Sequence, residues 1–241
     1  MKKVLILGAT SGIGLALAEE YLKHGCQVLG AGRSIEQLSD IKKSYPKDFE
    51  TEFIDIRDSE LLDQKLQNAI KKLGGMDICV ISSGISRRNR NLDWNLENDV
   101  IRTNVTGFSQ VAIFAANYFK QQGSGHIVGI SSIAKYFGNP HPAYNATKAF
   151  EAIYLDGLRL KLEHKNIFVT TLLPGFVETP MTEDQPLRFW SADVSVAARQ
   201  MVRAIERKKR NVFVTRRWRI FSWIIPPLPF ALIKMFLSRN R

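Results

Sequence analysis

Tyr144 and Lys148 lie four residues apart in a stretch with helical periodicity, so their side chains are expected on one face of a helix. A free phenol gives up its proton only near pH 10 and is a poor acid or base at neutral pH. An ammonium group about 4 Å away, at an effective dielectric constant of about 20, stabilises a phenolate by about 4 kcal/mol. The pair therefore predicts general acid–base chemistry. The alternative is a chance spacing on an amphipathic helix.

A glycine-rich turn follows the first apolar run, which starts at Val4. The turn carries Gly8, Gly12 and Gly14, and the pattern after it is helical. The first amides of a helix lack intrahelical partners, and the helix dipole is positive there, so the turn suits an anion such as the pyrophosphate of a dinucleotide. The spacing has one residue more than the common Gly-x-Gly-x-x-Gly pattern. The alternative is an ordinary strand–helix turn that binds nothing.

Two further residues follow apolar runs at places where a dinucleotide would lie. Gly32 stands where an acidic residue would bind a ribose 2′-hydroxyl, and Arg33 beside it suits a 2′-phosphate. This favours NADP(H) over NAD(H), unless Arg33 is a solvated loop arginine. Asp55 either accepts a hydrogen bond from the adenine amino group or caps a helix that begins near Ser59.

Between these residues, apolar runs alternate along the chain with segments of helical periodicity. This alternation is typical of an α/β fold with one doubly wound parallel sheet of six to seven strands and helices on both faces. Ligands of such sheets bind beyond the carboxyl ends of the strands. The apolar runs predict strands at 4–7, 27–31, 50–54, 77–82, 126–131, 167–173 and 212–215. Helices are predicted at 13–24, 35–44, 59–73, 98–121, 143–163 and 195–208.

Composition and charge favour one cytoplasmic domain followed by a distinct tail. The 241 residues are 45% hydrophobic and show no linker or repeat. The first residues lead directly into a predicted strand, so no signal peptide is expected. Cys26 and Cys79 are expected to be reduced thiols in core strands, with neither metal-binding nor redox spacing. The net charge of +11 arises entirely within residues 199–241, which argues against diffuse nucleic-acid binding.

The tail is expected to start after a domain of residues 1–215 and to cover 216–241. Its apolar run contains Pro226, Pro227 and Pro229, which disfavour a straight membrane-spanning helix. The prediction is peripheral contact with the inner face of a membrane, with Trp218 and Trp223 at headgroup depth and arginines beside them. The alternatives are packing on a partner subunit or over the ligand cleft.

Five motifs in order resemble the short-chain dehydrogenase/reductase family, which has a Rossmann-type sheet. They are the glycine turn, Asn104 in Thr-Asn-Val-Thr-Gly, the Ser131-Ser132 pair, Tyr144 with Lys148, and the run from Pro174 to Met181. The resemblance covers about residues 4–214.

The resemblance implies a role for each of four catalytic residues. Tyr144 would be the general acid/base, Lys148 would assist it and hold the nicotinamide ribose, Ser132 would orient the substrate carbonyl, and Asn104 would hold a water of the proton relay. Ser131 is the alternative to Ser132, and Thr179 would contact the nicotinamide carboxamide. The expected cofactor-binding residues are Gly8, Thr10, Ser11, Gly12, Ile13, Gly14, Arg33, Asp55, Gly84, Asn104, Tyr144, Lys148, Pro174, Gly175, Val177 and Thr179.

The chain departs from the family at Ser82-Ser83-Gly84, where Asn-Asn-Ala-Gly is usual. A hydroxyl replaces the asparagine that braces the adenine pocket, so weaker cofactor affinity is expected. Beyond Gly84, Arg87, Arg88 and Arg90 either meet an anionic substrate group or are solvated. The segment 181–191 is short and ends in Phe189 and Trp190, which favours an apolar substrate.

The expected function is an NADP(H)-dependent oxidoreductase that interconverts a carbonyl and a secondary alcohol on an apolar or lipid-like small molecule. One alternative is a cofactor-retaining epimerase step on a sugar-lipid. Another is a non-catalytic dinucleotide-binding sensor, which the complete set of Asn104, Ser132, Tyr144 and Lys148 argues against. The resemblance also suggests a homodimer or homotetramer, and no nucleic-acid partner is expected.

Overall fold

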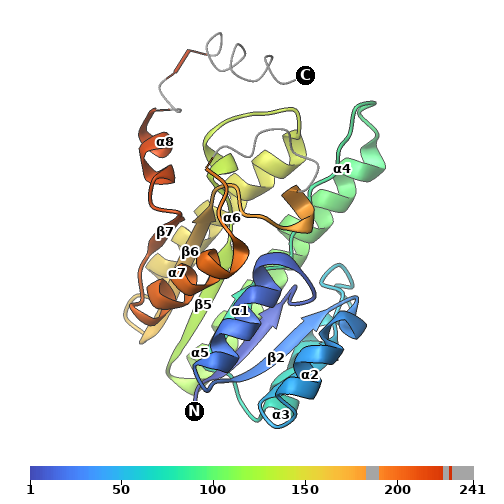
Figure 1. The fold of residues 1–241 in the computed structure, drawn as a ribbon, viewed down its shortest axis with the longest axis vertical. Coiled ribbons are helices and arrows are strands. Elements are labelled where there is room, and N and C mark those ends of the chain that lie inside the picture. Colours follow the sequence, from blue (N-terminus) through green and yellow to red (C-terminus); the bar gives the residue numbers. More distant parts are fainter. Residues whose placement is uncertain (183–189, 225–227, 230–241) are drawn as a thin grey trace.

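The computed structural model describes residues 1–182, 190–224 and 228–229. In these residues seven strands form one parallel sheet with the order β3-β2-β1-β4-β5-β6-β7 (Figure 1). The strands are β1 (Lys3–Leu7), β2 (Gln27–Gly32), β3 (Phe49–Phe53), β4 (Ile78–Ile81), β5 (Gly125–Ile130), β6 (Ile167–Pro174) and β7 (Asn211–Val214). The predicted doubly wound sheet is confirmed, and the order reverses beside β1, where the glycine turn lies.

Helices cover both faces of the sheet (Figure 1). The helical elements are α1 (Gly12–Lys23), α2 (Ser39–Ser44), α3 (Leu62–Leu73), α4 (Trp94–Ile101), α5 (Phe108–Gln122), α6 (Pro142–Leu162), α7 (Val194–Glu206) and α8 (Trp218–Ile224). Short helical turns also occur at η1 (Ile35–Leu38), η2 (Arg102–Gly107), η3 (Ile133–Tyr136) and η4 (Pro180–Thr182).

Alternate strand residues supply the two halves of the core. Val4 and Ile6 of β1 pack on the face covered by α1 and α7, while Leu5 and Leu7 pack on the face covered by α3, α5 and α6. Successive side chains of a strand point to opposite faces, so a strand buried on both faces must be apolar throughout. This is why the first strand is a continuous apolar run in the sequence.

The predicted helix at 35–44 is instead a 3₁₀ turn, η1, followed by the short helix α2. Cys26 also differs from the prediction, since it lies just before β2, whereas Cys79 lies in β4. Both thiols are buried and free, as expected.

The predicted helix at 98–121 is interrupted and begins earlier. It forms as α4, a π-helical turn, η2, and α5, with the side chain of Asp93 capping the start of α4. A π turn adds one residue to a helical turn, and such turns are frequent at functional sites. Here the π turn contains Asn104.

The start of the predicted tail is described, and the rest of it is not. Residues 216–224 lead from β7 into α8, and the Trp218 indole packs directly on Gly175. The predictions for Phe189 and for the prolines at 226 and 227 fall outside the described residues. Among the helices that the structure describes, none is both long and apolar enough to cross a membrane.

Candidate active site

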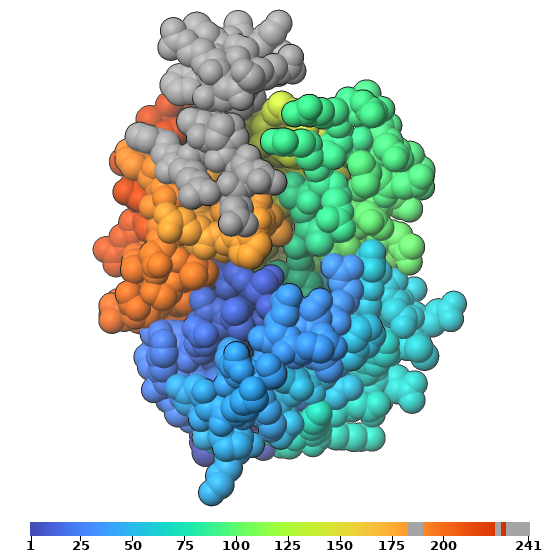
Figure 2. Space-filling model, turned by 45° about the vertical axis from the view of Figure 1, so that its right-hand side comes forward, coloured from blue at the N-terminus to red at the C-terminus, as the bar shows by residue number. Residues whose placement is uncertain are grey.

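A cavity of about 340 Å³ opens beyond the carboxyl ends of the central strands. Figure 2 shows this face, where the N-terminal part, coloured blue, meets the green and orange parts of the chain. The lining runs from Arg33 and Asp55 at one end, past the glycine turn, to Tyr144, Lys148 and Thr179 at the other. The cavity lies where the parallel sheet was expected to bind a ligand.

The glycine turn is built for close backbone approach. Gly8 has φ +82°, and a Cβ there would lie 2.5 Å from the backbone nitrogen of Ser83. A Cβ on Gly14 would lie 2.0 Å from the carbonyl oxygen of Gly8, so α1 could not pack on β1 with any larger residue. The first turn of α1 carries no acidic residue, and Ser11, Gly12 and Ile13 at its start line the cavity. The turn therefore suits an anionic group.

One end of the cavity is charged. Arg33 follows β2 and lines it with Asp55 and Arg57. Arg57 binds the Asp55 carboxylate through Nε and Nη2, at 3.1 Å and 2.7 Å, and its backbone amide donates to Oδ1 at 3.0 Å. Burial alone would raise the pKa of Asp55, but the hydrogen bonds from Arg57 lower it. The alternative role for Asp55, capping a helix near Ser59, is wrong because α3 begins at Leu62 after Leu61.

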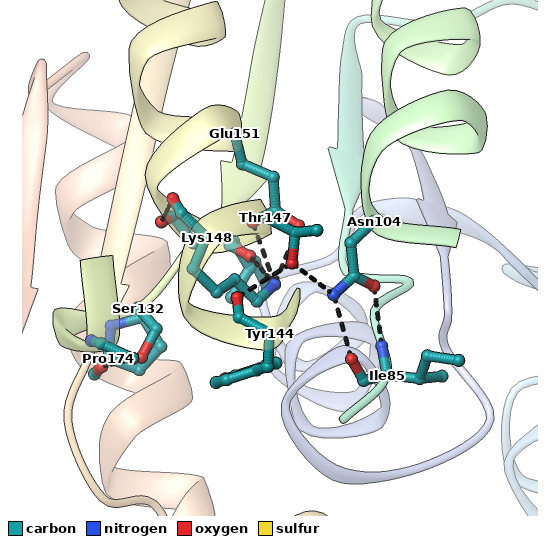
Figure 3. Close-up of polar contacts among 11 residues, drawn as sticks. Ile85, Asn104, Ser132, Tyr144, Thr147, Lys148, Glu151 and Pro174 are labelled. Atoms are coloured by element: carbon teal, nitrogen blue, oxygen red, sulfur yellow. Dashed lines mark hydrogen bonds and ion pairs between the residues drawn. The ribbon is translucent and has the colours of Figure 1, made fainter. Parts of the chain in front are cut away.

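The other end of the cavity brings the predicted acid–base residues together. Tyr144 and Lys148 project from the first turns of α6, and the Lys148 ammonium lies 5.7 Å from the centre of the Tyr144 ring (Figure 3). Ser132 follows β5, and its Oγ accepts a hydrogen bond from the amide of Ala134 at 3.1 Å. All three side chains line the cavity.

The hydroxyl groups of Ser131 and Ser132 have different hydrogen-bond partners. The Ser131 hydroxyl donates a 2.6 Å hydrogen bond to the carbonyl oxygen of Lys148 and so ties β5 to α6. The Ser132 hydroxyl has only a long 3.5 Å contact to the carbonyl oxygen of Pro174 as donor. Ser132 therefore retains the hydroxyl that is more available to a ligand, in line with its predicted role.

Asn104 lies behind the cavity wall rather than in it. Its Oδ1 accepts from the Ile85 amide at 2.9 Å, and its Nδ2 donates to the Ile85 carbonyl oxygen and to Thr147 Oγ1, both at 3.0 Å (Figure 3). The fully buried side chain thus joins the loop after β4 to α6. Asn104 fixes the positions of neighbouring groups in this arrangement.

Lys148 has an ionic partner, Glu151, that was not among the predicted site residues. Both carboxylate oxygens of Glu151 accept hydrogen bonds from Lys148 Nζ, at 3.0 Å and 2.9 Å. The third contact of Nζ is the carbonyl oxygen of Ile130, at 3.0 Å. The three-residue helical spacing was visible in the sequence, but nothing in it marked Glu151 as buried.

The cavity thus gathers almost all of the residues predicted from the sequence. Gly14 and Asn104 are the two predicted cofactor residues that pack behind the lining instead of contributing to it. Arg57, Thr147 and Glu151 were not among the predicted site residues. Arg57 stands two residues after Asp55, a spacing that allows it to pair with that carboxylate.

Comparisons with known proteins identify the family. The family described as short chain dehydrogenase matches residues 2–190. An uncharacterised oxidoreductase of Staphylococcus haemolyticus is 33% identical over 183 residues, covering 74% of this chain and 79% of the relative. The 3-oxoacyl-[acyl-carrier-protein] reductase of Thermotoga maritima is 31% identical over 194 residues, covering 77% and 78%.

The solved structures agree in fold. A short-chain dehydrogenase from Sphingobium yanoikuyae in complex with NADPH superposes with a TM-score of 0.82 at 21% identity, covering 100% of this chain and 97% of that one. The family match spans most of the chain and includes the glycine turn, Ser132, Tyr144 and Lys148. The chain therefore belongs to the short-chain dehydrogenase/reductase family of oxidoreductases.

Proposed function

We propose that the protein is an NADP(H)-dependent oxidoreductase that interconverts a carbonyl and a secondary alcohol on an apolar or lipid-like substrate. The observation that carries the proposal is the placement of Ser132, Tyr144 and Lys148 around one cavity that also contains the glycine turn. This arrangement puts a proton donor, a hydroxyl that can orient a carbonyl, and an anion-binding turn within reach of one elongated ligand.

The cavity residues fit a nicotinamide dinucleotide. The close approach of backbones at Gly8 and Gly14 leaves room for a pyrophosphate at the start of α1. Arg33 is the cation available for a 2′-phosphate, because Arg57 is already paired with Asp55. The similar Sphingobium dehydrogenase was solved with NADPH, which supports the same preference here.

When bound, the nicotinamide supplies or accepts a hydride at the substrate carbon. The residues of the chain perform the proton chemistry. In reduction, Ser132 Oγ orients the substrate carbonyl and Tyr144 Oη gives its proton to the carbonyl oxygen. Lys148 holds positive charge near the phenol, and Asn104 fixes the loop that carries Ile85 at the cavity edge.

The substrate side of the cavity supports an apolar ligand. Ile85, Val177 and Met181 line it. The similar Thermotoga enzyme is a 3-oxoacyl-[acyl-carrier-protein] reductase, which also supports a carbonyl on an acyl chain as substrate.

The start of the tail supports the further proposal of peripheral membrane contact. Ile220, Trp223 and Ile224 of α8 are exposed, next to Arg216 and Arg219. Apolar and indole side chains flanked by arginines suit the headgroup region of an anionic lipid surface. Because Trp218 packs on the cavity residue Gly175, such a surface would lie close to the cavity.

The test is oxidation of NADPH and NADH with a panel of apolar ketones, aldehydes and 3-oxoacyl thioesters, for the wild type, Tyr144→Phe and Tyr154→Phe. Tyr154 lies on the same helix and stacks on Phe150 instead of lining the cavity, so its variant is the matched control. We expect NADPH-selective turnover that falls by a factor of at least about 100 only in Tyr144→Phe.

Other results would redirect the assignment. Tight NADPH binding without turnover of any carbonyl would favour the cofactor-retaining epimerase or the dinucleotide sensor. If neither NADPH nor NADH binds, the cofactor assignment itself is wrong.

A further inference from the structure

Glu151 is a fully buried carboxylate one helical turn beyond Lys148, and it contributes nothing to the cavity lining. The Lys148 side chain is only 6% exposed. An ammonium group has three N–H donors. In this structure they are directed to Glu151 Oε1, Glu151 Oε2 and the carbonyl oxygen of Ile130. Lys148 lines the cavity, yet its donors are all committed to the protein.

Stability alone does not account for this ion pair. The free-energy cost of removing two charges from water often exceeds the gain from their attraction. Proteins in which apolar residues of similar size replace such a pair are frequently as stable as the original. Burial raises the pKa of Glu151 to about 7, although Lys148 acts in the opposite direction. The carboxylate therefore changes charge close to neutral pH, where it can affect Lys148.

The elements packed on α6 carry other charged or titratable groups, but these have partners elsewhere in the described residues. Glu97 of α4 accepts from the amide of Ala143, His126 of β5 bonds to Thr170, and Lys135 of η3 lies over the Tyr136 ring. Asp99 of α4 faces Arg57, Arg102 of η2 bonds to the carbonyl oxygen of Arg57, and Tyr118 of α5 packs on Phe119. Within the described part of the chain, Lys148 is the ionic partner of Glu151.

We propose that Glu151 is a positioning residue that holds the Lys148 ammonium back from a bound dinucleotide and so lowers the affinity of the site for NADP(H). The inference rests on the proposed function, since it assumes that the cavity binds this cofactor. When Glu151 is neutral or absent, one Lys148 donor is released, and rotation of the ammonium group turns it towards the cavity that Lys148 lines. A hydrogen bond from an ammonium to a cofactor hydroxyl then becomes available.

The direction in which pH changes cofactor affinity follows from the transfer of a Lys148 donor from Glu151 to the cofactor. Above the pKa of Glu151 the carboxylate keeps two donors of Lys148, and below it the neutral carboxyl offers one good acceptor and frees a donor. Binding of the cofactor should therefore tighten as pH falls from about 8 to about 6, with net proton uptake on binding.

The experiment measures the dissociation constant of NADP⁺ by isothermal titration calorimetry at about pH 6 and about pH 8. It compares the wild type with Glu151→Gln and with Glu163→Gln, which neutralises an exposed carboxylate at the end of the same helix. We expect Glu151→Gln to bind about tenfold more tightly than the wild type at the higher pH, the worth of one charge-assisted hydrogen bond. Glu163→Gln should match the wild type.

The pH dependence distinguishes this role from a structural one. The 2′-phosphate of NADP⁺ titrates in the same range and affects each protein alike, so only the difference between the wild type and Glu151→Gln reports on Glu151. We expect that difference to disappear at the lower pH. A variant that binds more weakly, or that keeps the full wild-type pH dependence, would overturn the proposal.

A second measurement needs no variant and guards against a poorly folded Glu151→Gln. Binding of NAD⁺, which lacks the 2′-phosphate, is measured near neutral pH in buffers of different ionisation enthalpy. Proton uptake by the wild type supports the proposal, and its absence contradicts it. If the wild type binds and turns over cofactor but takes up no proton on binding, and Glu151→Gln binds no more tightly than the wild type, only the role of Glu151 is wrong. If it binds no dinucleotide, the proposed function fails as well.

Discussion

The Asn104 side chain donates a 3.0 Å hydrogen bond to Thr147 Oγ1 and so joins the π-helical turn to α6. Thr147 lies between Tyr144 and Lys148 in sequence, and its hydroxyl donates to the carbonyl oxygen of Tyr144 at 2.9 Å. The helical turn that presents both acid–base residues is therefore held from behind by Asn104. Neither Asn104 nor Thr147 needs to contact the substrate to affect the geometry of Tyr144.

Thr147→Val is expected to lower both stability and turnover. Valine has the same shape but leaves one Asn104 donor unpaired in a buried position, which costs about 1–3 kcal/mol of unfolding free energy. Urea denaturation and kcat measure the two effects. Thr147→Ser keeps the hydroxyl and should retain most of both, so equal losses in the two variants would contradict this role of the hydrogen bond.

Replacing the buried ion pair with apolar residues should stabilise the fold and abolish activity. Lys148→Met or Glu151→Leu alone leaves one group unpaired and should cost about 3 kcal/mol, whereas the double variant should be at least as stable as the wild type. Chemical denaturation of the four proteins tests this. A double variant that loses the sum of the single losses would show that the pair itself stabilises the fold.

The stability difference between the wild type and the Lys148→Met/Glu151→Leu double variant should also depend on pH. The pKa of Glu151 is raised by burial from an ordinary 4.5 to about 7, so folding favours the protonated form. Its contribution to stability is complete below about pH 4.5 and is lost as pH rises through about 7, a change of about 3 kcal/mol. The stability advantage of the double variant should therefore grow over this range.

Arg33→Ala should weaken NADP⁺ binding about tenfold and leave NAD⁺ binding unchanged, because only NADP⁺ has the phosphate that a guanidinium would bind. Arg87→Ala, at an exposed position in the loop after Gly84, is the control. An acidic replacement of Gly32 is less informative, since a Cβ there would lie 2.8 Å from Thr10 Cγ2. Equal weakening of both dinucleotides would show that Arg33 is not the phosphate ligand.

Removing the exposed apolar side chains of α8 should reduce binding to lipid. Trp223 is 67% exposed and Ile220 is 52% exposed. The double replacement by serine should lower co-sedimentation with vesicles that contain phosphatidylglycerol by several-fold. Leu92→Ser changes an exposed apolar residue in the loop before α4 and should have no effect. Unchanged sedimentation would leave packing on a partner subunit as the better explanation of the tail.

The outer surface of α5 and α6 is expected to mediate self-association. Ile113, Ile153 and Leu160 are exposed there, and the family resemblance suggests a dimer or tetramer. Ile153→Glu should shift the mass measured by multi-angle light scattering toward the monomer. Leu61→Glu, at an exposed position before α3, should not change it. A wild type that is monomeric at all concentrations would refute the prediction.

The sequence predicted the strands to within about a residue because buried parallel strands are continuous apolar runs. It also predicted which residues would meet at the cavity, because β2, β4, β5 and β6 all end at the same edge of the sheet. Spacing on one helix placed Tyr144 and Lys148 together, and the succession of strands placed Ser132 beside them.

The features that were missed depend on packing between elements. The π turn around Asn104 adds a residue that helical periodicity does not reveal, so the segment was predicted as one helix. Nothing in the sequence marks Glu151 as buried, since glutamate is rarely buried, and only the packing of α6 against the sheet makes it a buried partner of Lys148. The pairing of Asp55 with Arg57 similarly depends on how the chain turns after β3.

Arg217 connects the residues before α8 with a segment that contacts the cavity lining. Its guanidinium donates to the carbonyl oxygens of Trp190 and Ser191, and the next residue of the chain, Ala192, forms an isolated β-bridge with the cavity residue Val177. A surface that binds α8 and a ligand that binds in the cavity are therefore connected by one short series of contacts, from Arg217 to Val177. Thermodynamic linkage makes such an influence mutual, so a surface contact that strengthens ligand binding is itself strengthened to the same extent when the ligand is bound.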